Sequence, residues 1–263
     1  MATQVEEQLE RVTEKHQRLA VARPLSAESV RSLHDDFIVR YAHETTAIEG
    51  NTLSLKETQV VLEGTTIGGK LLREHLEVVN ARDAMAWAEQ WVPQGQPITE
   101  ATILQLHEII MRGLIEDGAG LYRRHPVRII GSAWIPPNWV KVPNAMAHFI
   151  EHLRDTPHTE HPVRVAARAH IELAAIHPFL DGNGRVSRML VNVLLMKDDY
   201  PPALYTATSR AQYLTALEKA QVDGIEDDFV GITADAVETM LDRTLELVDM
   251  DIAANVYPAQ DEI

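Results

Sequence analysis

The chain has 263 residues, 45% of them hydrophobic and 24% charged, and a formal charge of −15. An apolar fraction this high excludes a disordered chain, and the acidic charge excludes binding to a nucleic-acid backbone. Cysteine is absent, which excludes disulfides and thiolate metal sites. No apolar run reaches the ~18 residues of a membrane span, and the polar, acidic first residues lack the apolar segment of a secretory signal, so we expect a cytoplasmic protein without membrane contact.

Apolar residues recur at three- and four-residue steps through most of the chain, which is the pattern of amphipathic helices. Ser26 is the expected N-cap of the second helix, and Ser54 with Glu57 forms a capping box for the third. In chain order the expected helices cover residues 3–20, 28–50, 55–63, 71–91, 100–114, 143–154, 162–176, 183–197, 209–221 and 226–249.

Residues 127–135 break this pattern. Two short apolar runs, Val127–Ile130 and Ala133–Ile135, flank Gly131-Ser132, which predicts a small β-hairpin. The chain contains no internal repeat and no linker rich in Gly or Ser. We therefore expect an all-α protein with one hairpin, folded as one compact unit from an N-terminal region (1–95), a core (96–225) and a C-terminal helix and tail (226–263).

Residues 177–188 read His-Pro-Phe-Leu-Asp-Gly-Asn-Gly-Arg-Val-Ser-Arg and join two expected helices. Gly182 and Gly184 let the backbone approach a ligand closely, and the N-terminus of the second helix carries a partial positive charge. Such a helix end is suited to phosphate. Arg185 and Arg188 add forked donors that match phosphate oxygens.

Two other residues of this segment suggest chemistry on the bound phosphates. Asp181 is a hard oxygen ligand placed where Mg²⁺ would bridge to phosphate, and His177 can accept a proton near neutral pH. Each residue alone is ordinary, but their combination within twelve residues predicts a Mg²⁺–polyphosphate site with a general base. The residues fit transfer of AMP, of phosphate or of another phosphate-linked group equally well.

The segment from His177 to Arg188 resembles the full signature of Fic-domain enzymes, and the resemblance extends from about Tyr41 to about Gln221. It implies a helical bundle with a β-hairpin flap, and transfer of AMP from ATP, with Mg²⁺, to a Ser, Thr or Tyr hydroxyl of a target protein or of the chain itself. By this resemblance His177 is the base and Asp181 the metal ligand. Gly182, Asn183 and Gly184 bind the α-phosphate, and Arg185 and Arg188 bind the β- and γ-phosphates.

The segment Thr45-Thr46-Ala47-Ile48-Glu49-Gly50-Asn51 is similar to the inhibitory motif of self-restrained Fic proteins. Its place before the signature corresponds to the class with an N-terminal inhibitory helix, here residues 28–50. Glu49 at the helix end is expected to pair with Arg188 and to occupy the space of the γ-phosphate, with Thr45 and Gly50 shaping the motif. Misplacing a reacting group by about 1 Å can cost about a hundredfold in rate.

The same resemblance assigns a target-binding flap to residues 127–135 and an adenine pocket to the expected helix 209–221. His148 and His152 lie four residues apart on one expected helix, but they lack a carboxylate partner at the right step, so we expect no metal there. The candidate flap residues are Arg128, Ile129, Ile130, Gly131 and Ser132, and the candidate adenine residues are Tyr213, Leu214 and Gln221.

Two other functions stay open. Removal of AMP from a modified protein would use Glu49 to orient a water molecule. A nucleotide-sensing or toxin-type interaction protein with little catalysis would bind nucleotide without transferring it. The target protein cannot be identified from the sequence, and a homodimer is expected only because relatives often dimerise.

Overall fold

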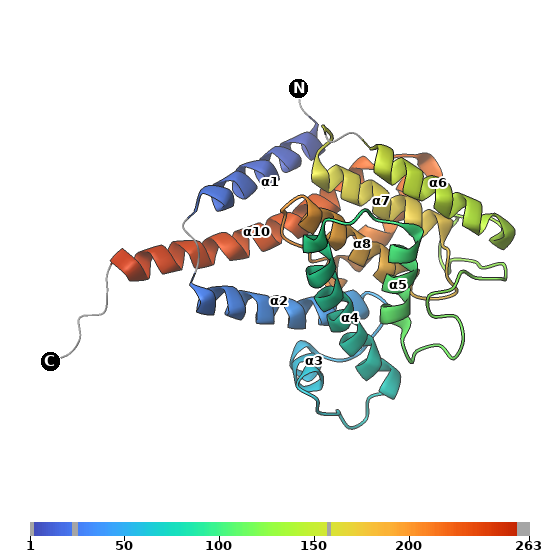
Figure 1. Ribbon diagram of the computed structural model, residues 1–263, viewed down its shortest axis with the longest axis horizontal. Coiled ribbons are helices and arrows are strands. Elements are labelled where there is room, and N and C mark those ends of the chain that lie inside the picture. Colours follow the sequence, from blue (N-terminus) through green and yellow to red (C-terminus); the bar gives the residue numbers. More distant parts are fainter. Residues whose placement is uncertain (1–2, 23–25, 157–158, 257–263) are drawn as a thin grey trace.

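A computed structural model describes residues 3–22, 26–156 and 159–256, with side chains up to residue 250. Its described part is helical, with short 3₁₀ turns and no strand (Figure 1). The α-helices are α1 (Gln4–Val21), α2 (Ala27–Ala47), α3 (Leu55–Leu62), α4 (Leu72–Trp91), α5 (Glu100–Met111), α6 (Val142–Asp155), α7 (Pro162–Ile176), α8 (Asn183–Lys197), α9 (Arg210–Asp223) and α10 (Asp227–Val256).

The helix starts predicted from capping residues are confirmed. The Ser26 hydroxyl accepts from the backbone N–H of Ser29 at 3.0 Å at the start of α2. At α3 the capping box is complete, because Ser54 accepts from the Glu57 N–H and the Glu57 carboxylate accepts from the Ser54 N–H. The last helix is longer than expected and reaches Val256, whereas the rest of the predicted tail, 257–263, lies outside the described residues.

The β-hairpin expected over residues 127–135 is not formed. The only backbone hydrogen bond within the segment closes a turn, from the Ser132 N–H to the Ile129 carbonyl at 3.3 Å. Side chains take the donors that a strand ladder needs: the Ala133 N–H donates to Glu218 at 2.5 Å and the Trp134 N–H to the Ser132 hydroxyl at 3.1 Å. The segment is therefore a loop that its side chains and α9 hold in place.

Helices α7 and α8 run through the middle of the molecule and the other helices cover them (Figure 1). One hydrophobic cluster fills the space between α2, α4, α5 and α8, and a second lies between α1, α7, α9 and α10. Helix α1 packs along α10, at the far end of the chain, where Arg18 pairs with Asp249 at 2.8 Å. The residues before position 95 therefore pack on both the central and the last helices.

None of the described helices has an apolar stretch long enough to cross a bilayer.

Replacing Leu190 by Ala tests the central position of α8. Leu190 is fully buried, so the substitution leaves a cavity and should lower the free energy of unfolding by about 2–5 kcal/mol in urea denaturation. Leu72→Ala removes the same atoms from a side chain that is 70% exposed, and it should change that free energy by less than about 0.5 kcal/mol. Equal effects of the two substitutions would contradict the packing described here.

Candidate active site

The signature segment forms the tight connection between α7 and α8. His177 ends α7 in the left-handed conformation, with φ of 50°, and its N–H donates to the Leu173 carbonyl at 3.0 Å. Gly182, with φ of 81°, precedes the first residue of α8. A residue other than glycine in the left-handed region is strained, and such strain persists where the surroundings hold the residue firmly.

The Asn183 side chain holds the loop together. Its Oδ1 accepts from the Phe179 N–H and its Nδ2 donates to the Phe179 carbonyl, both at 2.9 Å. Asn183 is buried, so these two bonds satisfy an amide that water does not reach. The phosphate contact of Asn183 stays a prediction, and in this structure the side chain acts on the loop.

His107 of α5 supports the same loop, although the sequence assigns it no role. Its ring stacks on Phe179 with a centroid distance of 3.7 Å. Nδ1 accepts from the Gly120 N–H at 2.9 Å, so the ring proton lies on Nε2, which donates to the Asp181 carbonyl at 3.1 Å. Burial lowers the pKa of His107 to about 4, so the ring is neutral at physiological pH.

Arg123 is the second support that the sequence leaves unassigned. It is 3% exposed, and its Nε donates to the His177 carbonyl at 2.8 Å. Its two terminal nitrogens donate to the His125 carbonyl at 3.1 Å and to the Pro137 carbonyl at 2.6 Å. Arg123 therefore ties both ends of the loop that contains residues 127–135 to the candidate base.

A cavity of about 300 Å³ lies beside His177 and brings most of the predicted site residues together. Helix α8 and its loop, the end of α2, the loop after Arg128, and α9 all contribute to its wall. The predicted residues that do not line this cavity are Thr45, Gly50, Arg128, Asp181, Gly182 and Arg185. Lining residues from the prediction are Glu49, Ile129, Ile130, Gly131, Ser132, His177, Asn183, Gly184, Arg188, Tyr213, Leu214 and Gln221.

The predicted pair between Glu49 and Arg188 is present. Arg188 is 1% exposed, and its Nη2 donates to Glu49 Oε1 at 2.7 Å and to the Thr45 carbonyl at 2.8 Å. Its Nε donates to the Thr45 hydroxyl at 3.0 Å and its Nη1 to the Tyr213 hydroxyl at 3.3 Å. Burial lowers the pKa of Arg188, but the charges and hydrogen bonds of Glu49 and Tyr213 together outweigh it and hold the pKa above its ordinary value.

The Glu49 carboxylate also covers the glycine at which the phosphate is expected. A Cβ added to Gly184 would lie 2.6 Å from Glu49 Oε1 and 3.1 Å from Arg188 Nη1. The end of α2 that carries Glu49 is fixed by a turn in which the Glu49 N–H donates to the Thr46 carbonyl and the Gly50 N–H to the Ala47 carbonyl, both at 3.0 Å. Gly50 has a φ of 100°, which only glycine adopts readily.

Tyr213 lines the cavity, but its hydroxyl group is engaged with other side chains, and its contact with adenine stays a prediction. It is 3% exposed, and its hydroxyl lies between Arg188 and His170, 2.8 Å from His170 Nε2. In the same cavity the Gln221 Nε2 is buried without a hydrogen-bond partner among the described residues. Gln221 therefore has a free buried donor in the cavity, whereas the Tyr213 hydroxyl accepts from Arg188.

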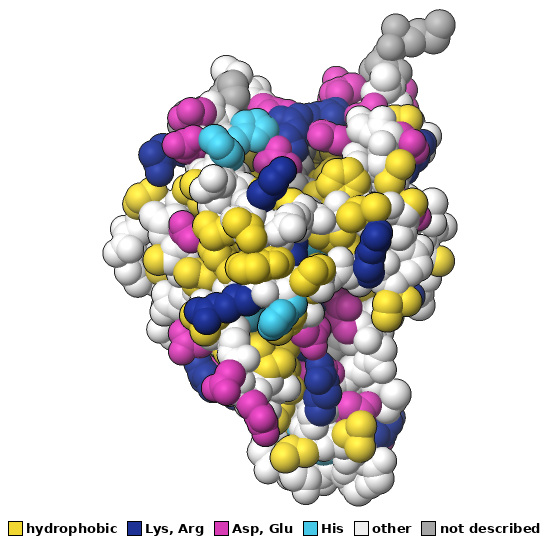
Figure 2. All heavy atoms as spheres, turned by 90° about the vertical axis from the view of Figure 1, so that its right-hand side faces the viewer, with side chains coloured by type: hydrophobic (Ala, Val, Ile, Leu, Met, Phe, Trp, Pro, Cys, Tyr) yellow, Lys and Arg dark blue, Asp and Glu magenta, His cyan; other side chains and the backbone are white. Residues whose placement is uncertain are grey.

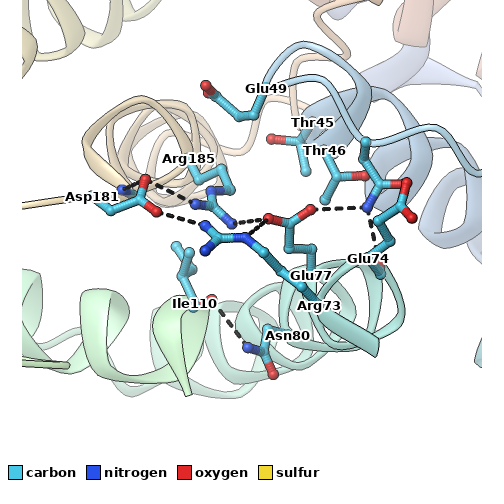
Figure 3. Close-up of polar contacts among 12 residues, drawn as sticks. Thr45, Thr46, Glu49, Arg73, Glu74, Glu77, Asn80, Ile110, Asp181 and Arg185 are labelled. Carbon is cyan, nitrogen blue, oxygen red and sulfur yellow. Dashed lines mark hydrogen bonds and ion pairs between the residues drawn. The ribbon is translucent and has the colours of Figure 1, made fainter. Parts of the chain in front are cut away.

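Asp181, the predicted metal ligand, is held by two arginines (Figure 3). Its Oδ2 accepts from Arg73 Nη2 at 2.7 Å, and its Oδ1 accepts from the Gly182 N–H at 2.6 Å and from Arg185 Nη2 at 3.3 Å. Burial raises the pKa of Asp181, but the charge of Arg185 and the bond from Arg73 outweigh it, so the pKa lies below its usual value. The carboxylate is therefore charged at neutral pH.

Arg185 is 4% exposed, and its Nε and Nη1 have no hydrogen-bond partner among the described residues. Buried donors of this kind are rare unless a ligand completes them. No group of three or more His, Asp or Glu that could hold a metal exists in the described part of the chain. Mg²⁺ characteristically takes one or two carboxylates together with phosphate oxygens and water. Asp181 could supply the carboxylate, and the Arg185 nitrogens without a hydrogen bond could bind the phosphate, so these residues fit Mg²⁺ bound with a polyphosphate.

Comparison with known proteins identifies the central part of the chain. Residues 97–195 match the model of the Fic/DOC family. The chain contains a Fic/DOC domain. Protein adenylyltransferase Fic of Drosophila ananassae is 34% identical over 91% of this chain, and that of Drosophila virilis is 35% identical over 82%. The aligned regions are 48% and 44% of these relatives, so the chain spans about half the length of the curated relatives it matches.

Solved Fic structures share the fold. A Fic-1 structure from C. elegans has a TM-score of 0.85 and 28% identity, covering 94% of this chain and 73% of that one. A Fic family protein from Desulfovibrio desulfuricans has a TM-score of 0.76 and 26% identity, covering 94% of this chain and 75% of that one. These structures cover 94% of this chain, so they share the helices before the Fic/DOC domain as well as the domain itself.

Gly184→Ala tests the contact between Glu49 and the phosphate cradle. The new methyl group pushes the Glu49 carboxylate away from Arg188, whereas in the Glu49→Gly protein it meets no carboxylate. Urea denaturation of the four proteins should give a coupling of about 0.5–3 kcal/mol, with the larger loss in the presence of Glu49. Additive losses would show that Glu49 does not cover Gly184.

The neutral His107 predicts a dependence of stability on pH. Its pKa falls from 6.5 in the unfolded chain to about 4 in the fold, so the unfolded chain binds a proton in this interval that the folded protein does not. The contribution of His107 is complete above pH 6.5 and is lost as the pH falls toward 4, by about 3 kcal/mol. Urea denaturation between pH 6.5 and 4 should show that the wild type loses about 3 kcal/mol more free energy of unfolding than His107→Gln does. Equal losses in the two proteins would contradict a neutral, buried His107.

Proposed function

We propose that this protein transfers AMP from ATP to a hydroxyl side chain of a protein target, and that Glu49 restrains the transfer. One observation carries the proposal: a single cavity holds a candidate base, a glycine at a helix N-terminus and a buried arginine whose carboxylate partner sits in the predicted phosphate space. The curated relatives named protein adenylyltransferase support the choice of AMP as the transferred group.

The polyphosphate of ATP would lie along the N-terminus of α8. The backbone N–H groups there are not needed within the helix and face the ligand. Arg185 offers Nε and Nη1, which make no hydrogen bond although Nη1 lies 3.5 Å from Glu77 Oε1, and Arg188 offers the Nη2 that now donates to Glu49. Mg²⁺ held by Asp181 would neutralise phosphate charge. Gln221, in the same cavity, is the polar group proposed to meet the base.

His177 is the proposed general base. Burial lowers its pKa, so the ring is neutral and able to accept a proton at neutral pH. It would take the proton of the target hydroxyl while the hydroxyl oxygen forms a bond to the α-phosphorus. The bond between the α-phosphorus and the oxygen bridging to the β-phosphate breaks, and pyrophosphate leaves with that electron pair.

The target would reach the base past the loop of residues 127–135. Its turn lines the cavity, and Ile130 at the tip is fully exposed. Figure 2 views the molecule from the right-hand side of Figure 1, and hydrophobic side chains gather in the middle of this face with charged side chains of both signs around them. An exposed apolar tip above a reactive cavity fits a protein target. Modification of the chain itself and a homodimer remain predictions.

Removal of AMP from a modified protein is the second candidate function. Only one oxygen of Glu49 takes part in the ion pair with Arg188, and the side chain is 36% exposed and lines the cavity. A carboxylate so placed could hold a water molecule beside the α-phosphorus. In this case Glu49 would be needed for activity, which is the opposite of the restraining role.

Replacing Glu49 by Gly should raise incorporation of labelled AMP by about tenfold to a hundredfold, because it frees Arg188 and the space above Gly184. The measurement is labelled-ATP transfer in a lysate, with self-labelling read in the same gel. Glu63→Gly is the matched control, because Glu63 ends α3 and precedes Gly64 as Glu49 precedes Gly50, but lies outside the cavity. His177→Ala in the Glu49→Gly protein should abolish the signal.

The outcomes separate the candidate functions. Unchanged labelling after Glu49→Gly, with nucleotide still bound, would favour a nucleotide-sensing protein over a transferase. Release of AMP from a labelled protein by the wild type, lost on Glu49→Gly, would establish the removal reaction. Labelling that survives His177→Ala would exclude the base.

A further inference from the structure

Arg73 pairs with Asp181, the predicted metal ligand. The residue lies in the first turn of α4, outside the signature, and its Nη2 is 2.7 Å from Asp181 Oδ2. The other oxygen of Asp181 already accepts from the Gly182 N–H and from Arg185. Both Asp181 oxygens therefore accept hydrogen bonds. The partners of Oδ1 belong to the signature itself, whereas the partner of Oδ2, Arg73, lies on α4.

Arg73 is held by its neighbour one turn along α4. Its Nε donates to Glu77 Oε1 at 3.1 Å, and the same oxygen lies 3.5 Å from Arg185 Nη1 (Figure 3). The other Glu77 oxygen accepts from Asn51 Nδ2 at 2.9 Å, and Asn51 directly follows the turn that carries Glu49. The network therefore reaches from the inhibitory turn, through Glu77 and Arg73, to the carboxylate of Asp181.

The members of this network differ in solvent exposure. Glu77 is 8% exposed and Arg185 4%, whereas the Arg73 side chain is 48% exposed. Mg²⁺ demands close octahedral coordination at about 2.1 Å, and a guanidinium on the same carboxylate oxygen would repel it, because both groups are cations. Arg73 can leave Asp181 for solvent, but Glu77 and Arg185 have no such exit.

We propose that Arg73 is a gate on Asp181: it occupies the cation-binding oxygen in the nucleotide-free protein and must be displaced when the metal binds with nucleotide. This inference rests on the proposed function, since the metal is the one that accompanies ATP. Arg73 is a positioning residue here, because it acts on the metal through Asp181. The chain thus restrains its signature at two points, Glu49 on Arg188 and Arg73 on Asp181.

The test is the binding of ADP, measured by isothermal titration calorimetry with EDTA and at increasing Mg²⁺. ADP lacks the γ-phosphate, so the pair between Glu49 and Arg188 does not obscure the result. Arg73→Ala and Arg73→Gln should both strengthen binding in Mg²⁺ by up to about fivefold, the scale of an exposed ion pair, and leave binding in EDTA unchanged. In an Asp181→Ala background Arg73→Ala should have no effect.

Arg82→Ala is the matched control. Arg82 lies on the same helix and pairs with Asp83 at 2.8 Å, so the variant removes the same charge and an ion pair outside the network. It should bind ADP as the wild type does. Thermal melting of each variant confirms that it is folded.

Two results would overturn the gate alone. Arg73 variants that bind ADP like the wild type at every Mg²⁺ concentration would show that the contact does not compete with metal. Variants that bind ADP more weakly in both EDTA and Mg²⁺ would make Arg73 a phosphate ligand. If neither the wild type nor any variant binds ADP, both the proposed function and the gate are overturned. If Glu49→Gly transfers AMP but Arg73→Ala responds to Mg²⁺ as the wild type does, only the gate is overturned.

Discussion

The complete burial of the Arg188 guanidinium is the constraint on which the site depends. A buried cation without partners costs far more free energy than a folded domain can lose, so the surrounding elements must supply acceptors. Helix α2 supplies the carbonyl and hydroxyl of Thr45 and the carboxylate of Glu49, and α9 supplies the hydroxyl of Tyr213. The turn that carries Glu49 is therefore part of the structural solution for Arg188, and it is the same turn that is proposed to restrain the transfer.

The surroundings of Arg188 would allow Glu49 to leave it at modest cost. Removing Glu49 leaves Arg188 with the two acceptors of Thr45 and with Tyr213, so the cation is not left without partners. Glu49 is also the most exposed member of the group, at 36% of its side chain, so its carboxylate can return to water. The fold therefore keeps Arg188 in place whether Glu49 or a phosphate completes its coordination.

The parts of the structure that local patterns determine were predictable from the sequence. Ser26 and Ser54 mark helix starts, and the residues from His177 to Arg188 mark the connection between two buried helices, because capping and turn chemistry act over a few residues. The pair between Glu49 and Arg188 was predicted across 139 positions, but only through the resemblance of both motifs to one family.

The predicted hairpin was wrong because a contact with a distant part of the chain decides the structure of residues 127–135. The alternation of residues 127–135 fits a strand, yet Glu218 on α9 takes the Ala133 N–H, and no local pattern reveals a partner 85 positions away. Arg73, His107 and Arg123 were missed in the same way, because they contact the signature loop from 108, 74 and 54 positions away. Such contacts are set by packing, and their residue types are common on any helix or loop.

The charge of −15 is compatible with an anion site because the site carries its own counter-ions. In the nucleotide-free protein Arg73 is paired with Asp181 and Glu77, Arg185 faces the same two carboxylates, and Arg188 is paired with Glu49. When a polyphosphate and its metal bind, phosphate would replace the carboxylate partners of the arginines, and the metal would replace the arginine partners of Asp181. Each buried charge would therefore keep a counter-charge. The acidic residues beside the site therefore do not oppose nucleotide binding in the way that the net charge suggests; they keep its arginines neutralised and in place until nucleotide takes over.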